Sequence, residues 1–271
     1  MRPVLGVVVP AHDEEELLAA CLAGLRTAVG AVADRARVDV LVVADACTDR
    51  TEAVARRCGV EVLRLDAHTV GRARAAGASS LLGRGPSWLA TTDADSVVPP
   101  DWLAAQLDAR AEGADAWVGT VEVADWRGLP TPVRRRYRDA YENGDGDAHR
   151  HVHGASLGIA ARAYEAVGGF PPRATGEDVA LVDRLDRAGF RVVRDGAHPV
   201  ATSARTVGRA PDGFARHLLG LAGRRVIADP SGTRRVEDPR PDQRRGRDNG
   251  SAAHISSGAP PAGTTAQDPR R

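Results

Sequence analysis

Two aspartates one residue apart, Asp93 and Asp95, follow directly after the apolar run Ser87–Thr92. A buried strand that ends in two carboxylates places hard oxygen ligands at the carboxyl edge of a sheet, where open α/β folds bind their ligands. This pattern is typical of a site for a metal ion and a diphosphate. The alternative is structural, because aspartate is also common in turns and at the start of a helix such as the one that Pro99 and Pro100 introduce.

Four short apolar runs predict strands that are buried on both faces of a parallel sheet, and three segments with helical spacing alternate with them. The expected strands are Val4–Val9, Asp39–Ala44, Val60–Leu65 and Ser87–Thr92, and the expected helices are Glu14–Gly30, Thr51–Cys58 and Gly71–Leu82. This alternation predicts an α/β fold with a single doubly wound, mostly parallel sheet flanked by helices.

Beyond Pro100 the pattern is less regular. The expected elements are a helix at Trp102–Glu112, a strand at Ala116–Ala124, an irregular loop at Asp125–Arg150, helices at Ala160–Val167 and Gly176–Ala188, two short strands within Arg191–Arg205 and a last helix at Gly213–Ile227. Large apolar residues are almost absent from Asp229 to Arg271. We therefore expect a folded domain over residues 1–228 and a disordered tail over residues 229–271.

Composition narrows the possible partners. The 37 basic residues, all of them arginine, nearly cancel the 36 acidic ones, which gives no general electrostatic reason to expect nucleic acid or a membrane surface. The three cysteines show no paired spacing, which favours a reducing, cytoplasmic location. No stretch approaches the roughly 20 apolar residues of a membrane-spanning helix.

Four motifs in one order carry a family resemblance. They are VVVPAHDEEELL, VVADACTDRT, TTDADS and GEDVALVDRL, and each has carboxylates at an expected strand end or helix start. Together they resemble the family 2 glycosyltransferases, enzymes of the GT-A fold, over roughly residues 3 to 225. The resemblance implies a transferase that moves a sugar from a nucleoside-diphosphate sugar to a hydroxyl acceptor.

Matching positions in the family imply which residues bind the donor. Asp45 would hold the uracil or ribose edge, Arg72 and Arg74 would lie near the nucleotide, and His12 and Asp13 depart from the aromatic residue and Asn that are usual in the family. Other residues that the resemblance assigns to the nucleotide sugar or its pocket are Pro10, Ala11, Glu14, Asp93, Ala94, His153, Gly154 and Arg205.

The resemblance also implies a metal ligand and a base. Asp95 would bind Mg²⁺ or Mn²⁺, and Asp93 would contact the ribose or the water shell of the ion. Asp178 would deprotonate the acceptor for attack with inversion, and Glu177 would orient the base or the acceptor. Acids in the first turn of a helix are also favoured by the helix dipole alone, which is the structural alternative for this pair.

Several alternatives stay open at this point. Asp49 serves a helix cap as readily as a ligand. The alternation of His149, His151 and His153 could suit a transition metal. A QxxRW-type motif is not found, which favours a non-processive enzyme. The competing functions are a nucleotide-sugar-binding protein without catalysis and a sugar-phosphate nucleotidyltransferase, whereas a dinucleotide oxidoreductase is disfavoured because no G-x-G-x-x-G follows the first strand.

Overall fold

A computed structural model describes residues 2–126, 131, 133–135 and 151–203, together with the backbone of residues 225–228 and 234–237. The chain divides into two compact units, 1–238 and 239–271, and every described residue lies in the first. Most of the expected irregular loop, most of the expected last helix and most of the tail therefore lie outside the described residues.

The first half of the described chain confirms the predicted alternation of strands and helices. In chain order its elements are β1 (Val4–Ala11), α1 (Leu18–Ala31), β2 (Arg37–Asp45), α2 (Thr51–Arg57), β3 (Glu61–Leu65), α3 (Val70–Leu82) and β4 (Trp88–Thr91). Valine and leucine fill β1 and β2, and the second halves of both strands are buried. Gly59 ends the α2 region with a positive φ of 75°, as expected of a residue that stops a helix.

The second half contains shorter elements. They are β5 (Ser96–Val97), α4 (Trp102–Ala111), β6 (Ala116–Val123), β7 (Leu157–Ala160), α6 (Ala161–Ala166), α7 (Glu177–Arg187) and β8 (Val192–Thr202), followed by β9 (Arg225–Ala228) and β10 (Arg234–Glu237). The last two form a separate antiparallel pair. Residues 225–227, expected at the end of a helix, are therefore in a strand, and residues 234–237 of the expected tail pair with it.

The large sheet is mixed, with the order β3-β2-β1-β4-β7-β6-β8-β5. Its first four strands are parallel to their neighbours, as the βαβ pattern predicts. β7 runs antiparallel to both β4 and β6, β8 runs parallel to β6, and β5 runs antiparallel to β8.

A short connection between β4 and β5 makes this sheet curl. The five Cα steps from Thr91 to Ser96 span at most about 18 Å when fully extended. Four strand spacings, the distance from β4 to β5 in a flat sheet, would require about 19 Å. The connection also contains a turn, in which the Ser96 N–H donates to the Asp93 carbonyl at 3.1 Å, so its reach is shorter still. The β5 edge must therefore bend back toward α1, where Val97 packs close to Gly24.

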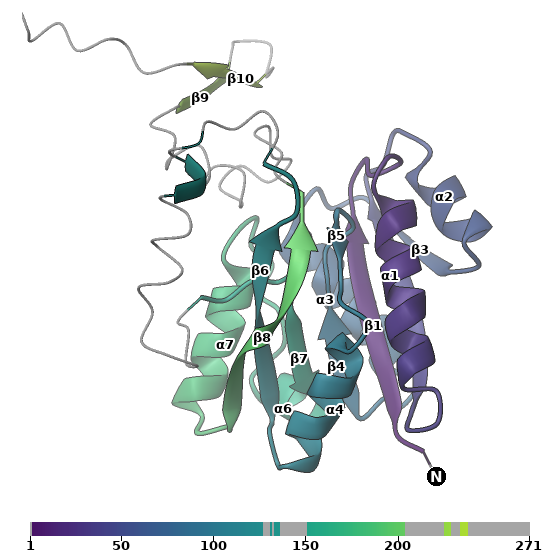
Figure 1. The fold of residues 1–271 in the computed structure, drawn as a ribbon, viewed down its shortest axis with the longest axis vertical. Helices are drawn as coiled ribbons and strands as arrows, with labels where there is room; N and C mark the ends of the chain where they lie inside the picture. The colour runs from purple at the N-terminus through teal and green to yellow at the C-terminus, as the bar shows by residue number, and fades with distance from the viewer. Residues whose placement is uncertain are drawn as a thin grey trace, which may run out of the picture. The chain divides into compact units, whose positions relative to one another are not determined.

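Helices cover both faces of the sheet (Figure 1). α1 and α4 lie on the face toward the viewer, and α3 lies behind the sheet. Gly77 lets α3 approach β1 and β2 closely, because a Cβ at this position would come within 2.5 Å of Val8 and 2.8 Å of Val43. The core is aliphatic and contains three fully buried tryptophans, Trp88, Trp102 and Trp117.

Three local predictions differ from the structure. α1 begins at Leu18, so Glu14, Glu15 and Glu16 lie in a turn before it rather than in its first turn. β7 was not expected, because its four residues LGIA contain no alternation that marks a strand. The two strands expected within Arg191–Arg205 are one strand, β8, interrupted by an irregularity: Asp195 pairs with Gly119 and Val200 with Val121.

Asp195 holds this irregular part of β8 together. Its carboxylate accepts the N–H groups of Ala197 at 2.8 Å and His198 at 3.1 Å, lies 3.0 Å from His198 Nδ1, and accepts the indole N–H of Trp117 at 3.4 Å. Burial alone would raise the pKa of Asp195, but the His198 ring and these N–H groups outweigh it and lower the pKa below 3.8. The ionised carboxylate is therefore the form that the fold stabilises.

We predict that Asp195→Asn destabilises the protein by about 1–3 kcal/mol near neutral pH, because the lost charge weakens several hydrogen bonds. A carboxyl group whose pKa is lowered by folding stabilises the fold above its unfolded pKa and loses this contribution as the pH falls through its folded pKa. The difference in unfolding free energy between variant and parent should therefore shrink from pH 6 to pH 3, measured by urea titration. The exposed Asp183→Asn is the control, and a difference independent of pH would contradict the prediction.

Candidate active site

The two aspartates of the TTDADS motif lie where the chain passes from β4 to β5. Asp95 is half-buried, its Oδ1 accepts the Ser96 hydroxyl at 3.1 Å, and its Oδ2 accepts the Ser203 hydroxyl at 3.0 Å. The Ser96 hydroxyl also lies 2.9 Å from the Thr202 hydroxyl, which can donate to it, at the β5–β8 pairing. The curl of the sheet thus brings the end of β8 to the strand-end carboxylate.

Arg74 connects this strand end to the acid helix α7. Its side chain is only 4% exposed. Nη2 donates to Asp93 Oδ1, and Nη1 donates to Glu177 Oε1, which is equally buried. The family resemblance placed Arg74 near the nucleotide, but in the structure its two Nη atoms bind protein carboxylates.

Asp178 is the second residue of α7 and is half-buried. Its Oδ2 accepts the backbone N–H of Gly154 at 2.7 Å, and its Oδ1 accepts the N–H of Val179 at 2.8 Å. Gly154 is buried and packs against the guanidinium of Arg74 so closely that a Cβ on this glycine would lie 2.3 Å from Arg74 Cζ. Gly154, Arg74, Glu177 and Asp178 therefore form one packed group with Asp93.

The crowding of carboxylates changes their ionisation. Burial, together with the charges of Asp95 and Asp178, raises the pKa of Asp93, although Arg74 opposes this. Burial and Asp178 likewise raise the pKa of Glu177, again against Arg74. Burial is the largest cause of both shifts, and the neighbouring carboxylates add to it.

The excess of negative charge in this group fits a divalent cation. Asp93, Glu177 and Asp178 lie near the Arg74 guanidinium, Asp95 lies beside Asp93, and carboxylate and hydroxyl oxygens are the ligands that Mg²⁺ and Mn²⁺ prefer. Asp95, Asp93 and Asp178 are half-buried and can be approached by an ion, whereas Glu177 is buried. Asp93 already accepts a hydrogen bond from Arg74 at one of its oxygens.

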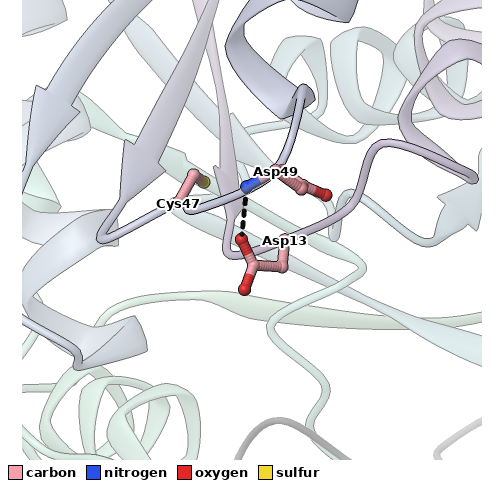
Figure 2. A group of neighbouring side chains, drawn as sticks. All are labelled: Asp13, Cys47 and Asp49. Carbon is pink, nitrogen blue, oxygen red and sulfur yellow. Dashed lines mark hydrogen bonds between the residues drawn. The ribbon is translucent and has the colours of Figure 1, made fainter.

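The loop after β1 binds the loop after β2 through aspartates (Figure 2). Asp13, which has a positive φ of 52°, accepts the N–H groups of Thr48 at 2.6 Å and Asp49 at 3.2 Å. Burial would raise the pKa of Asp13, but these hydrogen bonds outweigh it and lower the pKa. Asp49 in turn accepts the N–H of Glu15 at 2.9 Å and the N–H and hydroxyl of Thr51 at the start of α2.

Ligand atoms of Asp13, Cys47 and Asp49 lie within 4.8 Å of one another, a spacing that a metal ion could bridge. The two aspartates, however, accept several backbone N–H groups. Burial raises the pKa of the Cys47 thiol, which keeps it protonated and makes it a poor ligand. The contacts of this cluster are those of a structural link between loops, and Asp49 has the capping role that the sequence left open.

Asp45, at the end of β2, organises the loop that leads into α3. Its carboxylate is buried and accepts three backbone N–H groups, from Ala67 at 2.6 Å, His68 at 3.1 Å and Thr69 at 2.9 Å. The carbonyl oxygen of Asp45 lies 2.7 Å from His12 Nδ1, and the rings of His12 and His68 meet edge to face at 6.1 Å. Asp45 thus supports the loop that carries His68, and its carbonyl group contacts His12 of the loop after β1.

The remaining expected site residues differ in their exposure. Pro10, Ala11 and Ala94 are buried, Glu14 is 7% exposed and its N–H donates to Thr51 Oγ1 at 2.7 Å, and Arg72 is exposed on α3. His153 is half-buried and its ring stacks on that of His151 at 6.1 Å. Arg205 and His149 lie outside the described residues.

Comparison with protein families agrees with the geometry. A model described as glycosyl transferase family 2 matches residues 6–168, more than half of the chain. The chain belongs to glycosyl transferase family 2. The motifs around Asp45 and the Asp93–Asp95 pair lie within the match, and the acid helix α7 of this glycosyltransferase lies beyond it.

Solved structures similar to this glycosyltransferase have the GT-A fold. A mannosyltransferase from Pyrobaculum calidifontis, in complex with GDP-Man and Mn²⁺, has a TM-score of 0.58 and 21% identity, with 77% of this chain and 59% of that chain covered. Glucosyl-3-phosphoglycerate synthase from Mycobacterium tuberculosis, in complex with Mn²⁺, UDP and phosphoglyceric acid, has a TM-score of 0.57 and 17% identity, with coverage of 87% and 86%. TarS residues 1–349 from S. aureus, in complex with UDP-GlcNAc, has a TM-score of 0.57 and 13% identity, with coverage of 82% and 66%.

These likenesses establish the fold of the glycosyltransferase and leave its substrates open. The chain covers 61% of another structure of TarS 1–349, so the relatives contain regions that it does not match. No curated protein matches the chain in sequence. Among the helices of the described residues, none is long and apolar enough to cross a membrane.

The hydroxyl groups around Asp95 were missed by the sequence analysis. Ser96 directly follows Asp95, which is a usable signal, but the two residues of β5 are too few to show a strand. Ser203 lies 108 residues after Asp95, and only the curl of the sheet brings the two together.

We predict that Asp45→Asn destabilises the glycosyltransferase by about 1–3 kcal/mol, because an amide keeps one acceptor oxygen and turns an NH₂ group toward backbone N–H donors. Hydrogen exchange of the Ala67, His68 and Thr69 amides should become faster than in the parent. The exposed Asp66→Asn in the same loop is the control. Unchanged exchange at these amides would show that Asp45 does not hold the loop.

Proposed function

We propose that this chain is an inverting, metal-dependent glycosyltransferase that transfers one sugar from a nucleoside-diphosphate sugar to a hydroxyl group of its acceptor. The observation that carries the proposal is the connected group of Asp93, Arg74, Glu177 and Asp178, with Asp95 beside it. This group connects Asp93 and Asp95, which suit the donor side of the reaction, to Asp178, a partly exposed carboxylate that can accept a proton. The ligands of the similar solved structures, GDP-Man, UDP and UDP-GlcNAc with Mn²⁺ in two of the three complexes, support a donor of this class.

Asp178 is the proposed general base. Its two oxygens accept hydrogen bonds from the Gly154 and Val179 N–H groups, which orient the carboxylate and still leave lone pairs for an acceptor hydroxyl. As Asp178 takes the hydroxyl proton, the acceptor oxygen attacks the anomeric carbon and the bond to the diphosphate oxygen breaks on the opposite side. This in-line displacement inverts the anomeric configuration.

The donor side is proposed to use Asp95 as metal ligand, with Asp93 beside it. A bound Mg²⁺ or Mn²⁺ ion would supply positive charge for the departing nucleoside diphosphate. Arg72, which is exposed on α3, is the proposed phosphate contact on this helix, and the two loops that carry His12 and His68 are proposed to border the nucleobase. We propose that residues 1–228 suffice for this activity. The three free cysteines support our proposal of a reducing, cytoplasmic compartment.

Incubation with a panel of UDP- and GDP-sugars and Mn²⁺ or Mg²⁺ tests the proposal. Release of nucleoside diphosphate by slow hydrolysis, dependent on the cation, is the expected result. Release of pyrophosphate would instead indicate a nucleotidyltransferase, and tight binding without any turnover would indicate a binding protein. With an acceptor identified, products that carry several added sugars would contradict single transfer.

We predict that Asp178→Asn lowers the turnover number about 100- to 10,000-fold, the range by which a general base contributes to catalysis. Asparagine keeps the acceptor oxygen for the Gly154 N–H, so the affinity for the nucleotide sugar should stay near that of the parent. The exposed Asp183→Asn, on the same helix, is the control. Parent-like turnover in Asp178→Asn would exclude this residue as the base.

We predict that Asp95→Ala abolishes the gain in nucleoside-diphosphate affinity that Mn²⁺ provides, because the main carboxylate ligand is lost. Affinity measured in EDTA should change little, and the thermal midpoint should stay close to that of the parent, since a half-exposed carboxylate leaves no cavity. The exposed Asp108→Ala is the control. An undiminished Mn²⁺ effect would place the metal elsewhere.

A further inference from the structure

We propose that Arg74 is a positioning residue that fixes the proposed base helix α7 against the donor-side strand end, and that it does not contact the diphosphate. The inference rests on the proposed function. Two separate carboxylates share the guanidinium, Asp93 at the end of β4 and Glu177 at the start of α7. The side chain that joins them is 4% exposed, so it has almost no surface for a ligand.

The same guanidinium also supports the segment that holds Asp178. Gly154 packs against the guanidinium so closely that a Cβ on this glycine would lie 2.3 Å from Arg74 Cζ and 2.4 Å from each Nη atom. The N–H of Gly154 donates to Asp178 Oδ2 at 2.7 Å. The position of the guanidinium thus sets the place of both acids of α7, Glu177 by direct pairing and Asp178 through Gly154.

Arg74 is itself carried by a helix that is fixed at two points. At its start, the Gly71 N–H donates to the Arg173 carbonyl at 3.1 Å, and a Cβ on Gly71 would lie 2.4 Å from the Pro171 carbonyl oxygen. One turn after Arg74, Gly77 packs against Val8 and Val43 of the sheet. α3 is therefore in contact both with the sheet and with the segment that leads into α7, so its arginine has a defined place between them.

The guanidinium has N–H groups beyond the two that bind Asp93 and Glu177, but the side chain is only 4% exposed, so a phosphate could reach it only if Arg74 moved away from these carboxylates. Asp93 and Glu177 both lie near Asp178, and Asp93 also lies near Asp95. Removing the guanidinium from Glu177 would leave a carboxylate that is 4% exposed without its positive partner, and removing it from Asp93 would leave that carboxylate beside Asp95 and Asp178. Arg72, two residues earlier and exposed, can reach a ligand without that loss.

Lysine cannot substitute for Arg74 in this role. A guanidinium is a planar fork that donates to two carboxylates at once in a fixed geometry, whereas an ammonium is a point charge on a flexible stem. Arg74→Lys keeps the charge and loses the bridge. Gly154→Ala keeps the arginine and displaces its guanidinium, so the two variants disturb the same geometry by different means.

The test compares Arg74→Lys and Gly154→Ala with the parent and with Arg84→Lys. Arg84 makes a surface fork to Glu61, with both N–O distances 2.6 Å, and so controls for the chemical change itself. Two quantities are measured for each protein: the affinity for UDP, GDP, UMP and GMP with Mn²⁺, and kcat and KM for hydrolysis of the accepted nucleotide sugar, with water as acceptor.

Both variants should lower kcat about 10- to 100-fold, the cost of a base misplaced by roughly 1 Å, while Arg84→Lys leaves kcat unchanged. KM and the ratio of diphosphate to monophosphate affinity should stay within about threefold of the parent, because no phosphate contact is lost. Thermal midpoints establish that the compared proteins are folded; if Arg74→Lys is not, Gly154→Ala carries the same test.

Two results would overturn the role of Arg74. A fall in the diphosphate-to-monophosphate affinity ratio for Arg74→Lys, about tenfold or more, would identify a phosphate ligand. Parent-like kcat in either folded variant would show that the bridge does not position the base. A parent protein that binds none of the nucleotides would overturn the proposed function instead, so the two failures are distinct.

Discussion

The short connection from β4 to β5 is the constraint on which the rest of this site depends. Because Thr92–Asp95 is too short to cross a flat sheet, the sheet curls, and β5 and the end of β8 return toward the strand end that carries Asp93 and Asp95. The curl then brings the Ser203 hydroxyl to Asp95. The β4–β5 connection thus carries the proposed ligands Asp93 and Asp95 and also bends the sheet, which places Ser203 beside Asp95.

A second consequence is electrostatic. The curl and the position of α7 gather Asp93, Asp95, Glu177 and Asp178 around Arg74, and one positive charge cannot neutralise four carboxylates. The pKa values of Asp93 and Glu177 are raised mainly by burial and further by the neighbouring carboxylates. A site with this excess charge gains from any ligand that brings a divalent cation, which explains why a nucleoside diphosphate and its metal ion suit it better than a bare anion would.

Much of the parallel half of the fold could be predicted from the sequence, because β1, β2 and β4 are continuous apolar runs between helices with clear spacing. Prediction failed where an element is short or defined by distant partners. β5 has two residues and β7 four, and the single strand β8 was interpreted as two because Gly196 and Pro199 lie in its irregular part. Glu14–Glu16 suggested a helix start by their charge, yet the backbone there is held by Thr51 and Asp49 from another loop.

The carboxylates of the site were found in the sequence because strand ends and helix starts are local features. The burial of one particular arginine cannot be found from local sequence. Arg72 and Arg74 lie on the same helix and each carries a positive charge, and only the packing of the domain buries Arg74 and leaves Arg72 exposed. Glu177, the partner of Arg74, lies 103 residues away, and Gly154, which makes room for the arginine, carries no charge at all. The guanidinium can bridge its carboxylates only after β4, the segment around Gly154 and α7 have all docked, so the geometry of the site is a property of the complete domain and not of any one motif.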